Sequence, residues 1–155
     1  ANSGMSRWRF NGGRMTREHM QFLADAIRKY NLQHVHFTTG QCLQMHGLDG
    51  DTILNLFKEC HEHGIYNRGA GGDNPNVVAS ILRGIDPRET LDITPYAAAI
   101  SEFLMEQMFY IKLPRKFKMA IDNGFDSTPH TTFKDLGFNL TKYNENSEKP
   151  GHYHD

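Results

Sequence analysis

The chain has 155 residues, of which 38% are hydrophobic and 23% are charged, a composition that excludes an intrinsically disordered protein. Its length suits one ordinary domain with a single core, and a formal net charge of −1 excludes a general attraction to nucleic acid. No apolar run reaches membrane-spanning length and no signal peptide opens the chain, so we expect a soluble cytoplasmic protein that binds neither nucleic acid nor membrane.

The first predicted elements are a strand and a helix. Residues 1–6 are interpreted as a leader, and the alternating residues 7–10, followed by Asn-Gly-Gly, predict a short strand that ends in a tight turn. Thr16 is the predicted N-cap of a helix over about 17–30, with Met15 and Met20 as a hydrophobic staple. The apolar stripe of this helix has helical spacing and consists of Met20, Leu23, Ala24, Ile27 and Tyr30.

Residues 34–46 form an alternating strand pattern with one polar face. Because successive strand side chains point to opposite faces, one face can pack while the other offers hydrogen-bond donors. The polar face consists of His36, Thr38, Gly40, Cys42, Gln44 and His46. The opposite face consists of Val35, Phe37, Thr39, Gln41, Leu43 and Met45.

A second helix is predicted to begin at Asp49 or Asp51 and to end before Gly64. Its buried stripe is Ile53, Leu56, Phe57 and Cys60. His61 and His63 point about 200° apart on a helix, so we expect a structural role for them rather than a shared metal.

The second half begins with the glycine-rich loop 69–75, which lacks the spacing of a phosphate-binding loop. Thr94-Pro95 predicts a helix start, with Thr94 as the cap, and Pro114 limits the helix to about residue 112. A last strand is predicted over 133–140, and residues 141–155 are expected to be a loose tail.

Between these elements, residues 112–118 carry Lys112, Arg115, Lys116 and Lys118. The alternation places Phe117, Met119 and Ile121 on one strand face and Lys116 and Lys118 on the other. Such a strand suits a polyanionic ligand, while a solvated strand end is the alternative.

The two cysteines, Cys42 and Cys60, are too few for a disulfide scaffold or a self-contained iron–sulfur site. We expect both to be reduced and buried. The order of the predicted elements indicates an α+β fold, with helices packed on one face of a mixed sheet.

Four segments, in order, resemble motifs of the siroheme-dependent nitrite and sulfite reductases. Residues 36–46 are similar to H-F-T-T-R-Q-x-x-Q-x-H, and residues 71–77 to G-G-D-N-x-R-N-V. Residues 113–118 match L-P-R-K-F-K, and residues 135–138 match D-L-G-F. The resemblance implies a ferredoxin-like half-domain over 7–68 and the start of the siroheme domain over 69–140.

The resemblance also implies the site. Lys116 and Lys118 would be catalytic, holding the oxyanion of nitrite or sulfite and helping to supply protons. The residues implied to bind siroheme are His36, Thr38, Thr39, Gln41, Gln44, His46, Asn76 and Arg115. The 4Fe-4S cluster would belong to a complementary, cysteine-rich half, and the electron donor stays open.

Two positions depart from the family pattern. Gly40 replaces the arginine of H-F-T-T-R-Q, and Pro75 precedes Asn76 where the family has arginine. A glycine cannot replace a bidentate guanidinium donor. Three hypotheses therefore stand: a fragment or subunit of a nitrite/sulfite reductase, a non-catalytic binding module with the same half-domain fold, and a small protein that uses its histidines to bind a metal or anion.

Overall fold

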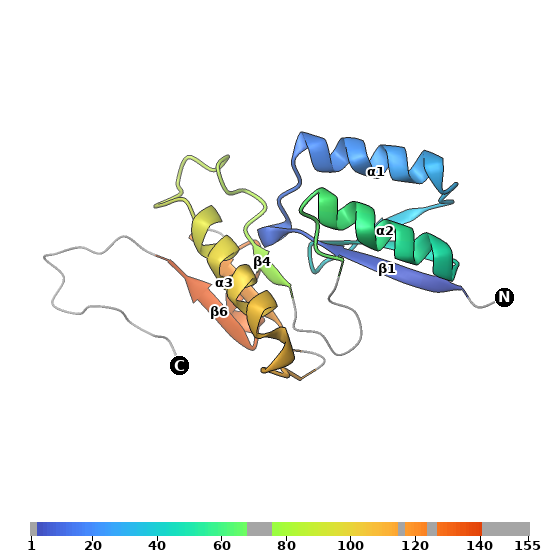
Figure 1. Cartoon of the computed structure of the whole chain (residues 1–155). Helices are drawn as coiled ribbons and strands as arrows, with labels where there is room; N and C mark the ends of the chain where they lie inside the picture. Colours follow the sequence, from blue (N-terminus) through green and yellow to red (C-terminus); the bar gives the residue numbers. More distant parts are fainter. Residues whose placement is uncertain (1–2, 68–75, 115–116, 124–126, 141–155) are drawn as a thin grey trace, which may run out of the picture.

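The computed structural model describes residues 3–67, 76–114, 117–123 and 127–140, which fold into two three-stranded sheets with three α-helices (Figure 1). The first sheet and its helices consist of β1 (Gly4–Arg9), α1 (Arg17–Lys29), β2 (Val35–Phe37), β3 (Cys42–Leu48) and α2 (Gly50–Glu62). The second sheet and its helix consist of β4 (Val77–Ala79), α3 (Thr94–Glu106), β5 (Met119–Asp122) and β6 (Leu136–Asn139). Three short 3-10 turns are η1 (Asn11–Gly13), η2 (Gln107–Phe109) and η3 (Thr131–Phe133). The α+β class is confirmed, and the strands divide into two sheets.

The first sheet is antiparallel in the order β1-β3-β2, and α1 and α2 cover one of its faces (Figure 1). Trp8 has no exposed surface and stacks on Phe22 of α1 with ring centroids 5.2 Å apart. Leu43, Met45 and Leu56 are equally buried around it. This face of the sheet is therefore the hydrophobic core of the first half.

Helices α1 and α2 begin where their capping residues predict. Thr16 accepts a hydrogen bond from His19 N at 3.2 Å, and Asp49 accepts one from Thr52 N at 2.8 Å. Gly64 has φ of +65°, which suits the residue after a helix end. The predicted staple fails at Met20, which is 47% exposed, because the buried side of α1 is formed by Phe22, Leu23 and Ala26.

β1 begins at Gly4, three residues before the predicted start of the half-domain at residue 7, so residues 4–6 are part of the first sheet. His63 stacks on the Phe22 ring at 4.2 Å, a packing role that agrees with the structural interpretation of the helix-end histidines. Among the described residues, no helix is long and apolar enough to cross a membrane.

The prediction of an unbroken alternation over 34–46 is wrong, because the segment is a hairpin. Gln41 has φ of +54°, Gln41 N donates to Thr38 O at 2.9 Å, and Thr38 N donates to Cys42 O at 2.8 Å. Thr39 and Gln41 therefore lie in the turn and not on an apolar strand face, and Phe37 is 58% exposed. The hairpin pairs Val35 with Met45, so the predicted face of these two residues survives the turn.

The second sheet is parallel in the order β4-β5-β6. The predicted strand over 117–121 is wrong in its bounds and its alternation, because β5 begins at Met119 and all four of its residues are buried. As the central strand of a parallel sheet, β5 is covered on both faces. Lys118 precedes the strand and is exposed, and residues 115–116 lie outside the described part of the chain.

Helix α3 packs on this sheet through Ala97 and Leu104. Pro95 lies in its first turn as predicted, but Ile93 and not Thr94 is at the N-cap position. Asp92 instead accepts the hydrogen bond of Thr94 N at 2.8 Å. The predicted last strand is shorter than expected, since residues 131–133 form η3.

Close backbone packing joins the two halves at Gly12, whose φ is +56°. A Cβ atom there would lie 3.0 Å from Ala79 Cβ and 3.3 Å from Ala97 Cβ. Arg83 Nη1 also donates to Gly12 O at 2.6 Å. A side chain at position 12 would therefore push β4 and α3 away from the first half.

Candidate functional site

The face of the first sheet opposite α1 and α2 is polar and cationic, and it is covered at Arg9, which is 4% exposed and whose Nη1 donates to Met105 Sδ of α3 at 3.3 Å. Trp8 points into the core, so Arg7 and Arg9 lie on the opposite face. The strand register places Arg7 beside Gln44 and Arg9 beside Cys42. We call this surface the polar sheet face and define it by Arg7, Arg9, His36, Cys42, Gln44 and His46.

Hydrogen bonds connect the side chains along this face. With the Gln44 amide oriented so that its oxygen faces Arg7, the oxygen accepts from Arg7 Nε at 3.0 Å, and the nitrogen donates to His46 Nε2 at 3.1 Å. Gln44 thus orients one guanidinium and one imidazole at the surface. His36 is the cross-strand neighbour of Gln44 and is exposed.

Positive charge converges on the thiol of Cys42. Burial raises the pKa of Cys42, while the charges of Arg9, Arg7 and Lys118 act in the opposite direction. Lys118 comes from the second half of the chain, directly before β5. The fold therefore brings cations from two distant segments to the polar sheet face, which suits an anionic ligand.

The turn beside this face is attached to the second sheet. Gln41 Nε2 donates to Ala79 O at 2.7 Å, and Gln41 Oε1 accepts from Ala79 N at 2.9 Å. Asn76 Nδ2 donates to Gly40 O at 2.9 Å and to Gln41 O at 3.2 Å. These contacts give Gln41 and Asn76 a positioning role, in which they fix the hairpin against β4.

The other turn residues differ in their exposure. Thr38 Oγ1 accepts from Cys42 N at 3.1 Å, and Thr39 is exposed. A Cβ atom on Gly40 would meet only Thr38 Oγ1, at 3.7 Å. The backbone therefore leaves room for a side chain at position 40.

The structure brings together a part of the predicted site. The predicted residues His36, Gln44 and His46 share the polar sheet face, and the charge of Lys118 acts on it. Arg115 and Lys116 lie outside the described residues. Arg7 and Arg9 lie outside the motifs, although their alternation with Trp8 already places both on the sheet face opposite the core.

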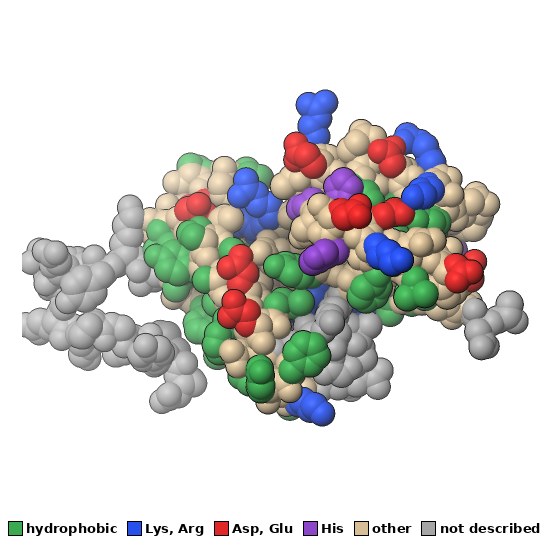
Figure 2. Space-filling model, viewed as in Figure 1, with side chains coloured by type: hydrophobic (Ala, Val, Ile, Leu, Met, Phe, Trp, Pro, Cys, Tyr) green, Lys and Arg blue, Asp and Glu red, His purple; other side chains and the backbone are tan. Residues whose placement is uncertain are grey.

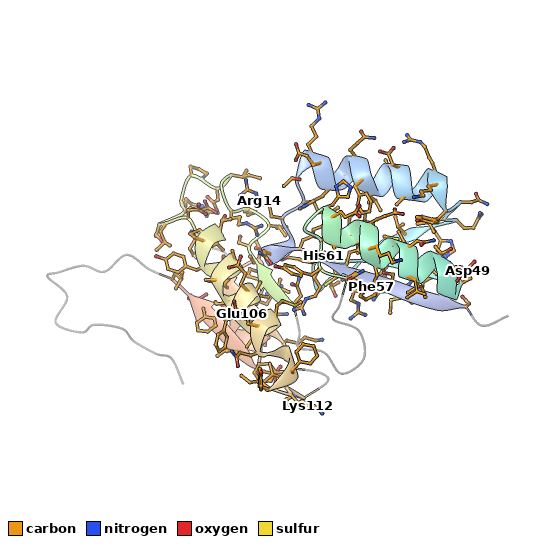
Figure 3. All side chains as sticks on the ribbon, in the orientation of Figure 1. Arg14, Asp49, Phe57, His61, Glu106 and Lys112 are labelled. Carbon is orange, nitrogen blue, oxygen red and sulfur yellow. The ribbon has the colours of Figure 1, made fainter. Side chains whose placement is uncertain are left out.

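A cleft of about 670 Å³ lies at the junction of the halves, beside the polar sheet face but separate from it. Its walls are the Gly12–Arg14 segment and the loop after β4, and Figure 3 shows Arg14 at this junction. Arg83 lines the cleft, and burial together with the charge of Arg14 lowers its pKa. Glu89 and Asp92 also line it, so the walls carry charges of both signs.

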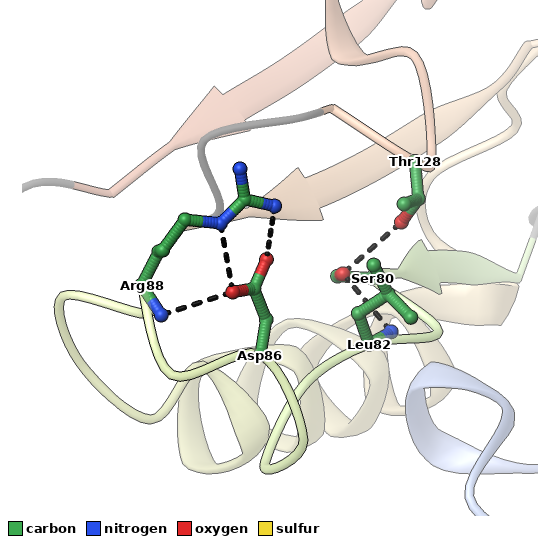
Figure 4. Close-up of polar contacts among 5 residues, drawn as sticks. All are labelled: Ser80, Leu82, Asp86, Arg88 and Thr128. Atoms are coloured by element: carbon green, nitrogen blue, oxygen red, sulfur yellow. Dashed lines mark hydrogen bonds and ion pairs between the residues drawn. The ribbon is translucent and has the colours of Figure 1, made fainter.

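Local hydrogen bonds hold the loop after β4 (Figure 4). Ser80 Oγ lies 3.0 Å from Thr128 Oγ1 and accepts from Leu82 N at 3.3 Å. Asp86 accepts from Arg88 Nη2 at 2.8 Å and from Nε at 3.0 Å, and these bonds lower the pKa of Asp86. Arg88 is thereby engaged within its own loop.

No group of three or more His, Cys, Asp or Glu side chains in the described ranges is arranged to hold a metal ion. The hypothesis of a histidine metal site therefore has no support from the geometry of these residues. Without a metal site, the described residues form an α+β protein with a cationic polar sheet face. Such a protein is suited to bind an anionic group.

Models of two protein families match the chain. The nitrite/sulfite reductase ferredoxin-like half domain matches residues 3–63. The nitrite and sulphite reductase 4Fe-4S domain matches residues 70–148, which are 79 of the 155 residues. The chain belongs to the nitrite and sulfite reductase family, as its motifs indicate.

Individual relatives agree with this membership. The ferredoxin–nitrite reductase of Synechococcus elongatus is 29% identical over 140 residues, which are 86% of this chain and 27% of that protein. The chloroplastic ferredoxin–nitrite reductase of Spinacia oleracea is also 29% identical over 140 residues, 86% of this chain and 24% of that protein. The chain therefore spans about a quarter of the length of these relatives.

A solved structure has the same fold. The NirA protein of Mycobacterium tuberculosis superposes with a TM-score of 0.66 and 25% sequence identity, over 79% of this chain and 22% of that chain. The ferredoxin-like half-domain fold expected from the motifs is confirmed.

Proposed function

We propose that this chain is the siroheme- and anion-holding part of a nitrite reductase. The observation that carries the proposal is the pairing of β1 with β3, which places Arg7 and Arg9 beside Gln44 and Cys42 on the polar sheet face. Nitrite is favoured over sulfite because the relatives named above are ferredoxin–nitrite reductases. By the same reasoning ferredoxin is the proposed electron donor, and the cytoplasm remains the proposed location.

The chemistry of the polar sheet face fits siroheme, a tetrapyrrole with many carboxylates. Arg7, its partner Gln44 and Lys118 would hold carboxylates through charge-assisted hydrogen bonds. His36 and His46 are exposed on the same face and would complete the polar surround. When bound, siroheme would pass electrons from the donor to the substrate, and the chain's own residues would attract, orient and protonate the anion.

The predicted lysines keep their proposed roles. Lys118 is exposed directly before β5 and is proposed, with Lys116, to hold a siroheme carboxylate or the substrate oxyanion and to help supply protons. Arg115 is proposed to hold a siroheme carboxylate. Thr38 and Thr39 flank the same turn and stay proposed contacts of the tetrapyrrole.

The cysteines do not fit the 4Fe-4S cluster. Such a cluster takes four cysteine ligands, and the chain contains only Cys42 and Cys60. Both thiols are buried, Cys42 on the polar sheet face beside Arg9 and Cys60 on the core side of α2. We therefore propose that a complementary cysteine-rich half supplies the cluster, and we keep residue 69 as the proposed start of the siroheme domain.

A non-catalytic binding module is the second candidate, and Gly40 favours it. Gly40 stands where the family motif has an arginine, and the backbone has room for a side chain at this position. A Gly40→Arg variant separates the two candidates. If the polar sheet face binds siroheme weakly for want of this cation, the variant should bind at least about tenfold more tightly, the equivalent of one charge-assisted hydrogen bond.

The direct test is a siroheme titration followed by visible absorbance. The purified chain is titrated alone and together with the part of the Synechococcus elongatus enzyme outside its 140 matched residues. A shifted Soret band that requires both chains is the expected result. Absence of a shift in both titrations, and with Gly40→Arg as well, would contradict the proposed function.

A further inference from the structure

Helix α3 has apolar side chains on two sides. Its inner side packs Ala97 and Leu104 into the core of the second half. On its outer side Tyr96 is 51% exposed and Phe103 is 54% exposed. These two aromatic residues are seven positions apart, so they lie on the same side of the helix, two turns from each other.

The exposed aromatic side chains continue past the end of the helix. Tyr110 follows Phe103 by another seven positions and is 82% exposed, and its neighbour Phe109 is 74% exposed. We call Tyr96, Phe103, Phe109 and Tyr110 the aromatic surface. Hydrophobic side chains gather over α3 in the space-filling view (Figure 2).

The charges on α3 differ from those on the other helices. From Thr94 to Ile111 the sequence contains no lysine or arginine, and its charged residues are Glu102 and Glu106, both exposed. Figure 3 shows Glu106 on α3. By contrast, the exposed residues of α1 and α2 include charges of both signs: Arg17, Glu18, Asp25, Arg28, Asp51, Lys58 and Glu62.

A helix that is apolar on all sides is normally buried on all sides. Single exposed apolar residues, such as Met20 on α1 and Leu54 on α2, are ordinary on a protein surface. The aromatic surface, by contrast, is a cluster of four large side chains on one helix and the turn after it. Each aromatic side chain buries about 150–250 Å² when it is fully covered. They would supply a large part of the roughly 800 Å² that each partner contributes to a standard interface.

We propose that the aromatic surface docks the complementary cysteine-rich half, an inference that rests on the proposed function. The length of the relatives supports this occupant, because about three quarters of each nitrite reductase relative lies beyond the part that this chain matches. The acidic residues Glu102 and Glu106 specify the chemistry of the partner surface. It presents apolar side chains to the aromatic surface and lysine or arginine at the rim.

The experiment is a co-expression with the part of the Synechococcus elongatus enzyme outside its 140 matched residues. The affinity-tagged chain is purified, and the amount of co-purifying partner is measured for three versions of the chain. The test variant is Tyr96→Glu with Phe103→Glu. The matched control is Met20→Glu with Leu54→Glu, which adds the same charge at apolar residues of similar exposure on α1 and α2.

Wild type and the control variant are expected to retain the partner. The test variant is expected to retain at least tenfold less partner. The test variant should unfold at the same temperature as wild type, because both side chains are already half exposed. Equal retention by the test variant, or no retention by wild type, would overturn the proposal. Self-association of the chain alone that Tyr96→Glu with Phe103→Glu abolishes would assign the surface to a second copy and overturn it as well.

The visible spectrum of the same eluates keeps the two proposals distinguishable. A complex that forms through the aromatic surface but carries no siroheme would leave the docking proposal standing and contradict the proposed function. Siroheme bound equally by wild type and by the test variant would leave the proposed function standing and contradict the docking proposal.

Discussion

The two halves of the molecule differ in how their helices cover the sheets. In the first half, α1 and α2 cover one face of an antiparallel sheet, expose charged residues to water and leave a polar sheet face. In the second half, one helix that is apolar on two sides covers a three-stranded parallel sheet.

This difference concerns how far each half covers its large apolar side chains. Antiparallel sheets tolerate one solvated face, whereas parallel sheets occur almost only with both faces covered. The first half therefore has its hydrophobic core on one face of the sheet and the polar sheet face on the other. In the second half β5 is buried, but the outer side of α3 leaves Tyr96 and Phe103 about half exposed.

The largest expected effect comes from a substitution in the core of the first half. Trp8→Ala removes a fully buried ring that stacks on Phe22, and it should lower the free energy of unfolding by about 3–5 kcal/mol. Urea denaturation measures this loss. Tyr110→Ala, which truncates a ring of the aromatic surface that is 82% exposed, should leave the stability of the isolated chain within about 0.5 kcal/mol of wild type. Similar losses for both variants would contradict the contrast between the halves.

The next effect concerns the connection between the halves. Gln41→Ala leaves the N–H and C=O groups of Ala79 without their side-chain partner, and it should cost about 1–3 kcal/mol. Hydrogen exchange of the Ala79 amide should accelerate as well. Thr39→Ala, at an exposed position in the same turn, is the control and should change neither quantity. An unchanged exchange rate in Gln41→Ala would show that the halves are held by other contacts.

A smaller effect depends on pH. Burial raises the pKa of Cys60 to about 12, and the nearby charge of Glu59 acts in the same direction. Above pH 9 the unfolded chain releases the thiol proton while the native chain keeps it, so stability falls as pH rises from about 9 toward 12. Urea denaturation at pH 8, 9 and 10 should show this fall, and Cys60→Ala should weaken it. The same slope in both proteins would contradict the assignment to Cys60.

The smallest effect is expected on the outer side of α1. Arg28 and Asp25 form an ion pair at 3.1 Å, but their side chains are 73% and 60% exposed. Solvent screens such a pair, so Arg28→Ala should change the midpoint of urea denaturation by no more than the error of the measurement. A clear destabilisation would show that the first half depends on its surface charges.

Sequence reasoning predicted the helices of the first half well because their ends carry local signals. Thr16, Asp49 and Gly64 each act through contacts or backbone angles within a few residues. The hairpin at Gln41 was missed because a glutamine with positive φ has no turn signature in the sequence. Two contacts with Ala79, 38 positions away, accompany this conformation.

The second sheet was harder to predict for a related reason. Asp122 and Ala120 are buried only because β5 lies between two parallel partners, and the local sequence does not show this environment. The site was partly predictable: the motif residues Gln44 and His46 do share one face. Arg7 and Arg9 match none of the quoted motifs, and the pairing of β1 with β3 is what brings them to the site.

The measurement that tests the central claim is the affinity for siroheme of two charge-matched double variants. Arg7→Gln with Lys118→Gln removes two cations from the polar sheet face, and Arg17→Gln with Lys58→Gln removes two from the helical side. With the complementary half present, the first variant should bind siroheme at least about tenfold more weakly for each lost cation, and the second should bind like wild type. Equal affinities for the two variants would contradict the assignment of the polar sheet face to the cofactor.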